Sequence, residues 1–489
     1  MTEDVPSKEI PTRKNIANFF SKVLAFLIAG ALLPSSLFAL SGCNTDAVVD
    51  TGIEPWTASA EQIARASELA GRNKLMVGCW IPPRPHQMTN DEEADERMKE
   101  VYESGINMVC THHDDLRDME FIHRLIKASA KYGIDVMIEL STDVSPAGIR
   151  ANLAVVEETK DYENLIGYNL YDEPIDPHLS GLTDEYEAVK ALVPDKIVML
   201  NMLPNYGPLD TMAPTVTKGL TKYQTYVDNF AGTGTDALSF DFYPYMAGGE
   251  TIAFGSFISN CCDFVLASRK YNRPVWGFLQ DCSWAGMLLP EEAGLRLDAH
   301  CHLLFQVKSY SYFLYAQPYE PDASSSGFDG MLRWNNKKTQ TYTRVQKNNA
   351  EIANFGNRVL SYDLSGIYAD KLTKDHRSCV DKSLKISRGT KFKSITTDLD
   401  YEVIAGVFKP RSEEANIADG YATDTADEAV YVVNFSRFNR VTATVKFNGV
   451  REYTVWGPEG IESMGAASEV TLELIEGDAR FIEFKTFGD

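Results

Sequence analysis

Short apolar runs recur along the chain between residues 74 and 317. Each run is rich in β-branched or aromatic residues, and a loop and a longer amphipathic segment follow most of them. The runs are apolar almost throughout, which is typical of parallel strands that are covered on both faces. We predict eight such strands, at residues 74–81, 105–112, 133–141, 165–173, 196–203, 237–245, 274–280 and 309–317.

The segments between these strands have the pattern of helices. The segment that begins at Asn90 has acidic residues in its first turn, as helix starts do, and residues 119–132 carry apolar side chains at helical spacing. Eight strands alternating with helices over about 250 residues predict a (β/α)8 barrel. A doubly wound open sheet is the alternative, but no glycine-rich phosphate turn follows the first strand.

The pattern changes after about residue 370. The remaining segments are short and alternate between apolar and polar residues, with Gly, Asn and Pro turns between them. They predict a small antiparallel β-sandwich at residues 371–489, after a barrel at residues 74–370.

The N-terminus has the pattern of a targeting segment. Arg13, Lys14 and Lys22 precede an apolar stretch that ends in Leu40-Ser41-Gly42-Cys43, and this ending resembles a bacterial lipobox with Cys43 as the acylated residue. We therefore expect residues 1–43 to be a lipoprotein signal peptide, and residues 44–73 a tether and short helix capped by Ser59. The alternative is a single membrane-spanning anchor, which needs roughly 20 apolar residues. Either interpretation places the protein outside the cytoplasm, tethered to a membrane.

The net charge and the spacing of the cysteines disfavour some classes of ligand. The formal net charge of -22 is spread along the chain, so nucleic acid is disfavoured and a neutral substrate is the easier fit. Seven cysteines follow Cys43 without CxxC or Cys/His spacing, which argues against a disulfide framework and a zinc site. We expect no metal and no cofactor.

The predicted strand ends are the expected place for chemistry, because barrel enzymes place their active residues there. By strand alternation, Glu173 is expected to share a face with Tyr171 and Asn169. His112 and His113 suggest metal ligands, but without a third spaced ligand a structural or sugar-binding role is preferred. The strand ends carry carboxylates, amides and aromatic rings, namely Trp80, Glu139, Asp172, Glu173, Asn201, Asp241, Tyr243, Tyr245, Gln280, Asp281, Trp284, Gln317 and Tyr319. Aromatic planes and carboxylates together suit a sugar, whose ring stacks on the planes and whose glycosidic bond needs an acid.

Three motifs carry a resemblance to a known group. "GYNLYDEP" at residues 167–174 resembles the acid/base motif of (β/α)8 glycoside hydrolases of the large retaining clan. "LSFDFYPY" at 238–245 and "PVWGFLQ" at 274–280 are similar to relatives of the family 42 galactosidases, and the C-terminal domain is similar to their accessory β-domain. The resemblance implies a glycosidase that acts on an extracellular oligosaccharide or glycan.

The resemblance also implies roles for single residues. Glu173 matches the general acid/base, and Asp172 stands where the clan usually has Asn. Gln280 stands where the clan has its nucleophilic Glu. The expected substrate-binding residues are Trp80, Asn169, Asn201, Tyr243, Tyr245, Gln280, Trp284, Gln317 and Tyr319.

Because Gln280 cannot attack as an anion, three interpretations stay open. Asp241 or Asp281 supplies the second carboxylate. Alternatively, Asp172 and Glu173 work as an adjacent pair in a substrate-assisted N-acetylhexosaminidase, with Tyr243 holding the acetamide carbonyl. In the third interpretation the protein is an inactive surface lipoprotein that binds glycans.

Overall fold

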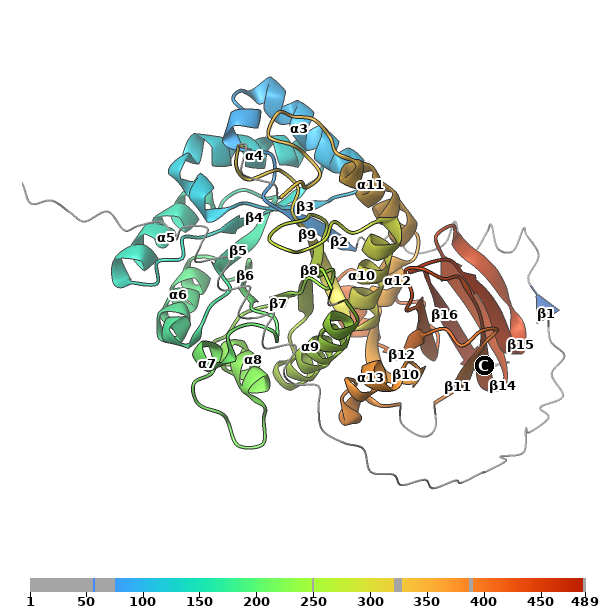
Figure 1. The fold of residues 1–489 in the computed structure, drawn as a ribbon. Helices are drawn as coiled ribbons and strands as arrows, with labels where there is room; N and C mark the ends of the chain where they lie inside the picture. The colour runs from blue at the N-terminus through green and yellow to red at the C-terminus, as the bar shows by residue number, and fades with distance from the viewer. Residues whose placement is uncertain (1–55, 58–74, 249, 321–327, 387–389, 487–489) are drawn as a thin grey trace, which may run out of the picture. The chain divides into compact units, whose positions relative to one another are not determined.

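The computed structural model describes residues 56–57, 75–248, 250–320, 328–386 and 390–486 (Figure 1). The predicted signal peptide, Cys43 and the short helix expected after Ser59 lie outside these residues and stay predictions. Among the described residues, no helix is long and apolar enough to cross a membrane.

Eight parallel strands of the described chain close into a barrel in sequence order (Figure 1). They are β2 (Met76–Trp80), β3 (Met108–Cys110), β4 (Asp135–Glu139), β5 (Leu165–Asp172), β6 (Ile197–Met202), β7 (Leu238–Asp241), β8 (Val275–Gln280) and β9 (Val307–Phe313). The described helices that accompany them are α3 (Asp91–Glu103), α4 (Met119–Lys131), α5 (Pro146–Thr159), α6 (Leu179–Leu192), α7 (Leu209–Met212), α8 (Lys222–Gly232), α9 (Glu250–Tyr271), α10 (Glu292–Leu304), α11 (Gln340–Ala353) and α12 (Gly356–Leu360). The predicted barrel is confirmed.

Local sequence signals set where several helices begin. The Asn90 side chain accepts a hydrogen bond from the Glu93 N–H at the start of α3, as the sequence pattern predicts. Asp118 accepts one from the Phe121 N–H at the start of α4. Each cap satisfies a backbone donor that the first helical turn leaves free.

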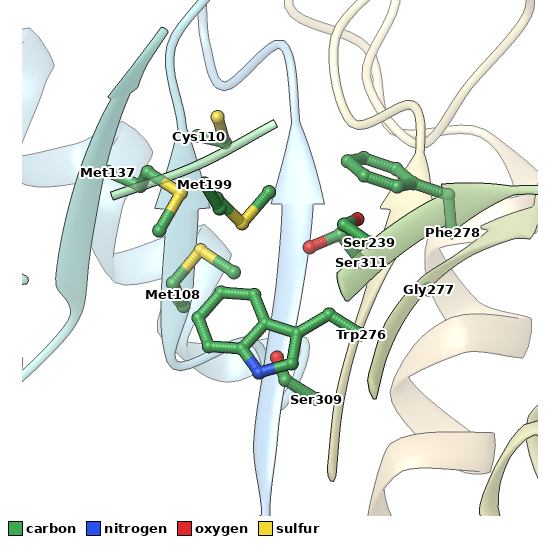
Figure 2. A pocket seen from close by; sticks show the side chains of 10 residues that line it. All are labelled: Met108, Cys110, Met137, Met199, Ser239, Trp276, Gly277, Phe278, Ser309 and Ser311. Carbon is green, nitrogen blue, oxygen red and sulfur yellow. The ribbon is translucent and has the colours of Figure 1, made fainter. Parts of the chain in front are cut away.

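The barrel interior below its C-terminal mouth is filled with sulfur-containing and aromatic side chains. Figure 2 shows Met108, Met137, Met199 and Trp276 gathered around a small cavity, which Ser239 also lines. The Ser239 hydroxyl donates to Asn201 Oδ1 at 2.9 Å. The floor of the barrel is thus linked by a hydrogen bond to the polar residues at its mouth.

A β-bulge in β5 changes which side chains enter the barrel. Asn169 pairs with Met199 and Asp172 with Asn201, with an irregularity between the two pairs. Two residues of β5 lie where strict alternation has one, so Asn169 and Asp172 share the inner face. The expectation that Asn169 shares a face with Tyr171 and Glu173 is therefore wrong.

The C-terminal domain is one continuous antiparallel sheet that curls around its own apolar core. Its described strands are β1 (Trp56–Thr57), β10 (Tyr362–Lys371), β11 (Phe392–Thr397), β12 (Val403–Pro410), β13 (Glu428–Asn434), β14 (Val441–Gly457), β15 (Gly460–Leu474) and β16 (Ala479–Thr486). The helices α13 (Lys374–Ser378) and α14 (Glu413–Ala418) interrupt them. The predicted all-β domain is confirmed. Apart from β1, which lies in the segment predicted to be a tether, its strands begin at Tyr362.

A buried carboxylate joins the last barrel helix to this sheet. Glu483 on β16 is 5% exposed and accepts hydrogen bonds from Arg358 Nη2 at 2.7 Å, from Trp456 Nε1 at 2.6 Å and from the Tyr362 hydroxyl. Buried charges of this kind are stabilising only while their partners are in place.

We expect Glu483→Gln to lower the free energy of unfolding by about 2 kcal/mol, because the new amide turns an N–H toward these donors. Urea denaturation at unchanged slope measures the loss. In the control Glu452→Gln, the exposed pair with Lys485 at 3.7 Å is removed, and we expect a change under about 0.5 kcal/mol. Equal effects of the two substitutions would contradict the role of Glu483.

Candidate active site

Three carboxyl groups meet at the C-terminal mouth of the barrel. Asn201 Nδ2 donates to Asp172 Oδ1 at 3.0 Å and to Asp241 Oδ1 at 3.4 Å. The carboxyl groups of Glu173 and Asp241 are hydrogen-bonded to each other. The structure thus brings together all three predicted catalytic residues, and we call them the acid cluster.

The Glu173 backbone is held in an unusual conformation. Its φ is +54°, in the left-handed region that non-glycine residues rarely adopt. The Glu173 N–H donates to the Asn201 carbonyl at 2.9 Å, and the Tyr226 hydroxyl donates to the Pro174 carbonyl at 2.9 Å. The Leu203 N–H in turn donates to the Tyr226 oxygen at 3.0 Å. Strain of this kind persists where surrounding contacts enforce it, and it gathers at functional sites.

These contacts make Tyr226 a positioning residue for Glu173. We expect Tyr226→Phe to lower kcat about tenfold and to leave KM within twofold, because the turn loses one of its two anchors while the substrate-facing groups remain. The pH dependence of kcat should shift as well, since Glu173 would sit in a changed environment. The control Tyr223→Phe removes a 2.9 Å hydrogen bond from the same helix to the Leu203 carbonyl, one step away from the turn. Equal losses of kcat in the two variants would mean that Tyr226 stabilises the fold and does not position Glu173.

Burial raises the pKa of every member of the acid cluster, and neighbouring carboxyl groups raise it further. Asp241 is 4% exposed; burial first, and the charges of Glu173 and Asp172 second, raise its pKa well above the usual range. Part of the Glu173 side chain reaches solvent, but its carboxyl group is closely surrounded by protein atoms. This burial and the Asp172 charge raise the pKa of Glu173 to about 8. Burial and the Glu139 charge raise the pKa of Asp172 to about 7. Asp172 therefore ionises before Glu173 as the pH rises.

A second polar group lies beside the acid cluster and has no role in the sequence-based prediction. Glu139, fully buried at the end of β4, accepts from Trp80 Nε1 at 2.5 Å and is bonded to His113 Nδ1 at 2.6 Å. The hydrogen bond to Glu139 is the main cause that raises the pKa of His113, and the nearby Asp172 carboxylate raises it as well. The sequence places Glu139 at a strand end, but its pairing with His113 joins β4 to the loop after β3 and has no local signal.

One group of described residues has the composition of a metal site. Ligand atoms of His112, His113 and Asp114 lie within 4.8 Å of one another. His113 Nδ1 is hydrogen-bonded to Glu139, and His112 Nδ1 accepts a hydrogen bond from the Asp114 N–H at 3.2 Å. Asp114 forms a salt bridge with Arg117 at 3.0 Å. Burial and the neighbouring His113 lower the pKa of His112 to about 4. Because these groups have protein partners, we assign the cluster no metal.

The end of β8 contributes no carboxylate to the mouth. Gln280 is fully buried; its Nε2 donates to the Leu288 carbonyl at 2.8 Å and the Tyr245 carbonyl at 3.3 Å, and its Oε1 accepts from the Tyr245 N–H at 3.0 Å. This arrangement leaves no free polar atom for a sugar, so the substrate contact predicted for Gln280 lacks structural support. Asp281 is also fully buried, near Cys79, and burial raises its pKa well above the usual range.

The remaining predicted substrate residues divide into two sets. Tyr243 and Trp284 lie edge to face with ring centroids 4.9 Å apart, and the Tyr243 phenol lies near all three acid-cluster carboxyls. Away from the cluster, the buried Tyr245 donates to the Gly294 carbonyl at 2.6 Å, and Gln317 Oε1 accepts from the Trp334 N–H at 3.1 Å.

Comparison with known proteins relates this architecture to glycoside hydrolases of known structure. No family model matches the sequence, and no curated protein matches it significantly. A family 5 glycoside hydrolase from Bacteroides vulgatus is similar in structure, with a TM-score of 0.50 and 12% identity over 84% of this chain and 89% of that one. A catalytic mutant of a family 42 β-galactosidase from G. stearothermophilus has a TM-score of 0.51 and 10% identity over 84% of this chain and 98% of that one. The likeness is one of fold.

Proposed function

We propose that the protein hydrolyses a glycosidic bond of an oligosaccharide or glycan, with Glu173 as the general acid. The observation that carries this proposal is the acid cluster, in which Glu173 is open to solvent and has a pKa of about 8. A carboxyl group with such a pKa is protonated when substrate arrives, as acid catalysis requires. Glu173 would give its proton to the leaving oxygen as the bond from the anomeric carbon breaks, and water would supply the hydroxyl.

The shared fold and the quoted motifs support kinship with the family 42 enzymes, but the spacing of the carboxyl groups differs. Oxygens of hydrogen-bonded carboxyls lie about 2.5–3.0 Å apart. Retaining glycosidases separate their carboxyl groups by ~5–5.5 Å and inverting ones by ~6.5–9.5 Å. The Glu173–Asp241 pair therefore matches neither spacing.

The order of ionisation favours a second candidate, a substrate-assisted N-acetylhexosaminidase. Asp172 ionises before Glu173, so near neutral pH an anion stands beside a protonated acid. An acetamide N–H could donate to the Asp172 anion, and the nearby Tyr243 phenol could hold the acetamide carbonyl. The acetamide oxygen would then attack the anomeric carbon, and no carboxylate at the end of β8 would be needed.

A panel of chromogenic glycosides tests both candidates. It should contain plain hexosides and N-acetylhexosaminides of both anomeric configurations, and each should be assayed with wild type and Glu173→Gln. Hydrolysis of any member that depends on Glu173 supports the glycosidase, and hydrolysis of N-acetylhexosaminides alone supports the substrate-assisted mechanism. Sugar binding without hydrolysis would instead support an inactive glycan-binding protein.

The pH profile follows from the same groups. Glu173 must be protonated, so we expect kcat/KM to fall above about pH 8. In the substrate-assisted mechanism Asp172 must be ionised, so we expect kcat/KM to fall below about pH 7 as well. Initial rates from pH 4 to 10 measure the profile. An optimum near pH 4–5, where ordinary carboxyl groups titrate, would contradict the raised pKa values.

We further propose that Cys43 carries a lipid that anchors the protein to the outer side of a membrane. The Leu40–Cys43 motif after an apolar stretch supports this. Incorporation of labelled palmitate by wild type but not by Cys43→Ser would agree with it. Equal labelling, or none, would contradict it.

A further inference from the structure

A continuous row of aromatic rings leads away from the acid cluster. Ring centroids of successive members lie 5.4, 4.9, 6.1 and 6.5 Å apart, and the first and third steps are stacked. We call this row the aromatic strip; its members in order are Trp80, Phe313, Trp284, Phe328 and Tyr319. Tyr243 contacts both Phe313 and Trp284, and this contact ties the strip to the strand end that carries Asp241.

The strip is accessible along its length. Its first four rings are half-buried, and the ring of Tyr319 at its outer end is 64% exposed. Large apolar side chains that line up at a surface, rather than occurring singly, mark binding sites. The end at Trp80 is fixed by the hydrogen bond to the buried Glu139, so the strip starts at the catalytic groups and runs outward.

The chemistry of the strip fits an apolar ligand better than a sugar. Phe313 and Phe328 have no polar side-chain atom, and the Trp80 N–H is already donated to Glu139. Leu288 and Leu289 are exposed on the loop that follows Trp284. A chain of sugars would need hydrogen-bond partners for its hydroxyls, and beyond Trp80 the strip has only the Trp284 N–H and the Tyr319 hydroxyl to offer. The negative charge of the protein disfavours an anionic group as well.

We propose that the aromatic strip is a subsite for a neutral, apolar leaving group, an alkyl or aryl aglycone. This inference rests on the proposed glycosidase and names the class of its substrate. Glu173 would protonate the oxygen that joins the sugar to the aglycone, and an apolar alcohol or phenol would leave along the strip.

Binding of a sugar-free probe tests the strip independently of catalysis. The neutral dye N-phenyl-1-naphthylamine should bind to the full-length protein with increased fluorescence, and Tyr319→Ser together with Phe328→Ser should weaken this binding at least fivefold. Phe438→Ser is the matched control, because Phe438 is 68% exposed on the C-terminal domain, and it should leave the binding unchanged. Equal binding by the double variant and wild type would overturn the proposal. Displacement of the dye by a neutral tetrasaccharide but not by 1-octanol would also overturn it, in favour of a glycan track.

Chain length tests the strip in the working enzyme. We expect kcat/KM to rise from methyl to octyl glycosides of a sugar that the enzyme hydrolyses. Full burial of a methylene group gives roughly a fourfold gain, and we expect about half of that factor, twofold per methylene. The total gain from methyl to octyl is then about a hundredfold. The gain should shrink at least fivefold in the double variant and persist in Phe438→Ser. No dependence on chain length would overturn the proposal. If no glycoside is hydrolysed although the dye result holds, the glycosidase fails and the apolar site stands.

Discussion

Glu173→Gln should reduce kcat/KM about a thousandfold toward glycosides with alkyl leaving groups. Gln has nearly the same volume and keeps the backbone hydrogen bond to Asn201, but it cannot supply a proton to a leaving oxygen. General acid catalysis contributes about 10²–10⁴-fold, so the loss should fall within this range. The falling limb above pH 8 should disappear at the same time, because it reports the titration of Glu173.

The leaving group provides an internal control for this substitution. A nitrophenolate leaves without protonation, so kcat/KM of Glu173→Gln on nitrophenyl glycosides should fall far less, about tenfold. The matched variant Asp176→Asn removes a carboxylate three residues along the same loop and should retain full activity. Equal losses for alkyl and nitrophenyl glycosides would mean that Glu173 supports the site without donating a proton. Unchanged activity of Glu173→Gln would remove it from the mechanism altogether.

The architecture follows from the sequence because both of its signals are strong and local. Parallel barrel strands are buried on both faces and therefore read as unbroken apolar runs, while the strands after residue 370 alternate. The same patterns do not show how the alternating strands close. The structure joins them into one curled sheet in which β14 pairs with β11, β15 and β16, and such pairings depend on contacts far apart in the sequence.

The acid cluster was predictable as a set of strand ends, but its geometry was not. The bulge in β5 turns Asp172 toward Asn201 and leaves Glu173 beyond the strand in a left-handed turn. Neither feature has a glycine or other sequence mark, since contacts from β6 and from Tyr226 impose them. The pairing of Glu139 with His113 is likewise long-range, so Glu139 could be placed at the mouth but not given a partner.

Asp172→Asn should lower kcat about a hundredfold or more on N-acetylhexosaminides if the substrate-assisted mechanism holds. Asp172 ionises before Glu173, and Asn removes the Asp172 charge while it keeps the size and one acceptor for Asn201. The rate should stop falling below pH 7, because no group would remain that must ionise there. The pKa of Glu173 should fall too, since it loses a neighbouring negative charge, so the upper limb should move to lower pH.

Two matched variants separate this outcome from a second carboxylate elsewhere. Asp241 is hydrogen-bonded to Glu173, and an Asn at this position can donate a hydrogen bond to Glu173 through its amide. We therefore expect kcat of Asp241→Asn on N-acetylhexosaminides to fall less than tenfold. Asp281→Asn replaces a fully buried carboxyl, whose pKa burial raises, by an isosteric amide and should retain activity. A thousandfold loss in Asp241→Asn, with Asp172→Asn mildly affected, would instead make Asp241 the catalytic anion.

Asp172→Asn also recreates the Asn-Glu-Pro order to which the "DEP" of this chain is compared. In the retaining clan that Asn is expected to bond a sugar hydroxyl, a task that needs no charge. If Asp172 bonds a sugar hydroxyl in the same way, the substitution should be neutral or should raise kcat/KM on plain hexosides, because Asn can both donate and accept. If Asp172 instead stabilises an acetamide N–H as an anion, the same change removes activity on N-acetylhexosaminides. One substitution, assayed on both substrate classes, thus decides between an Asp172 that bonds a sugar hydroxyl and an Asp172 that acts as an anion on an acetamide.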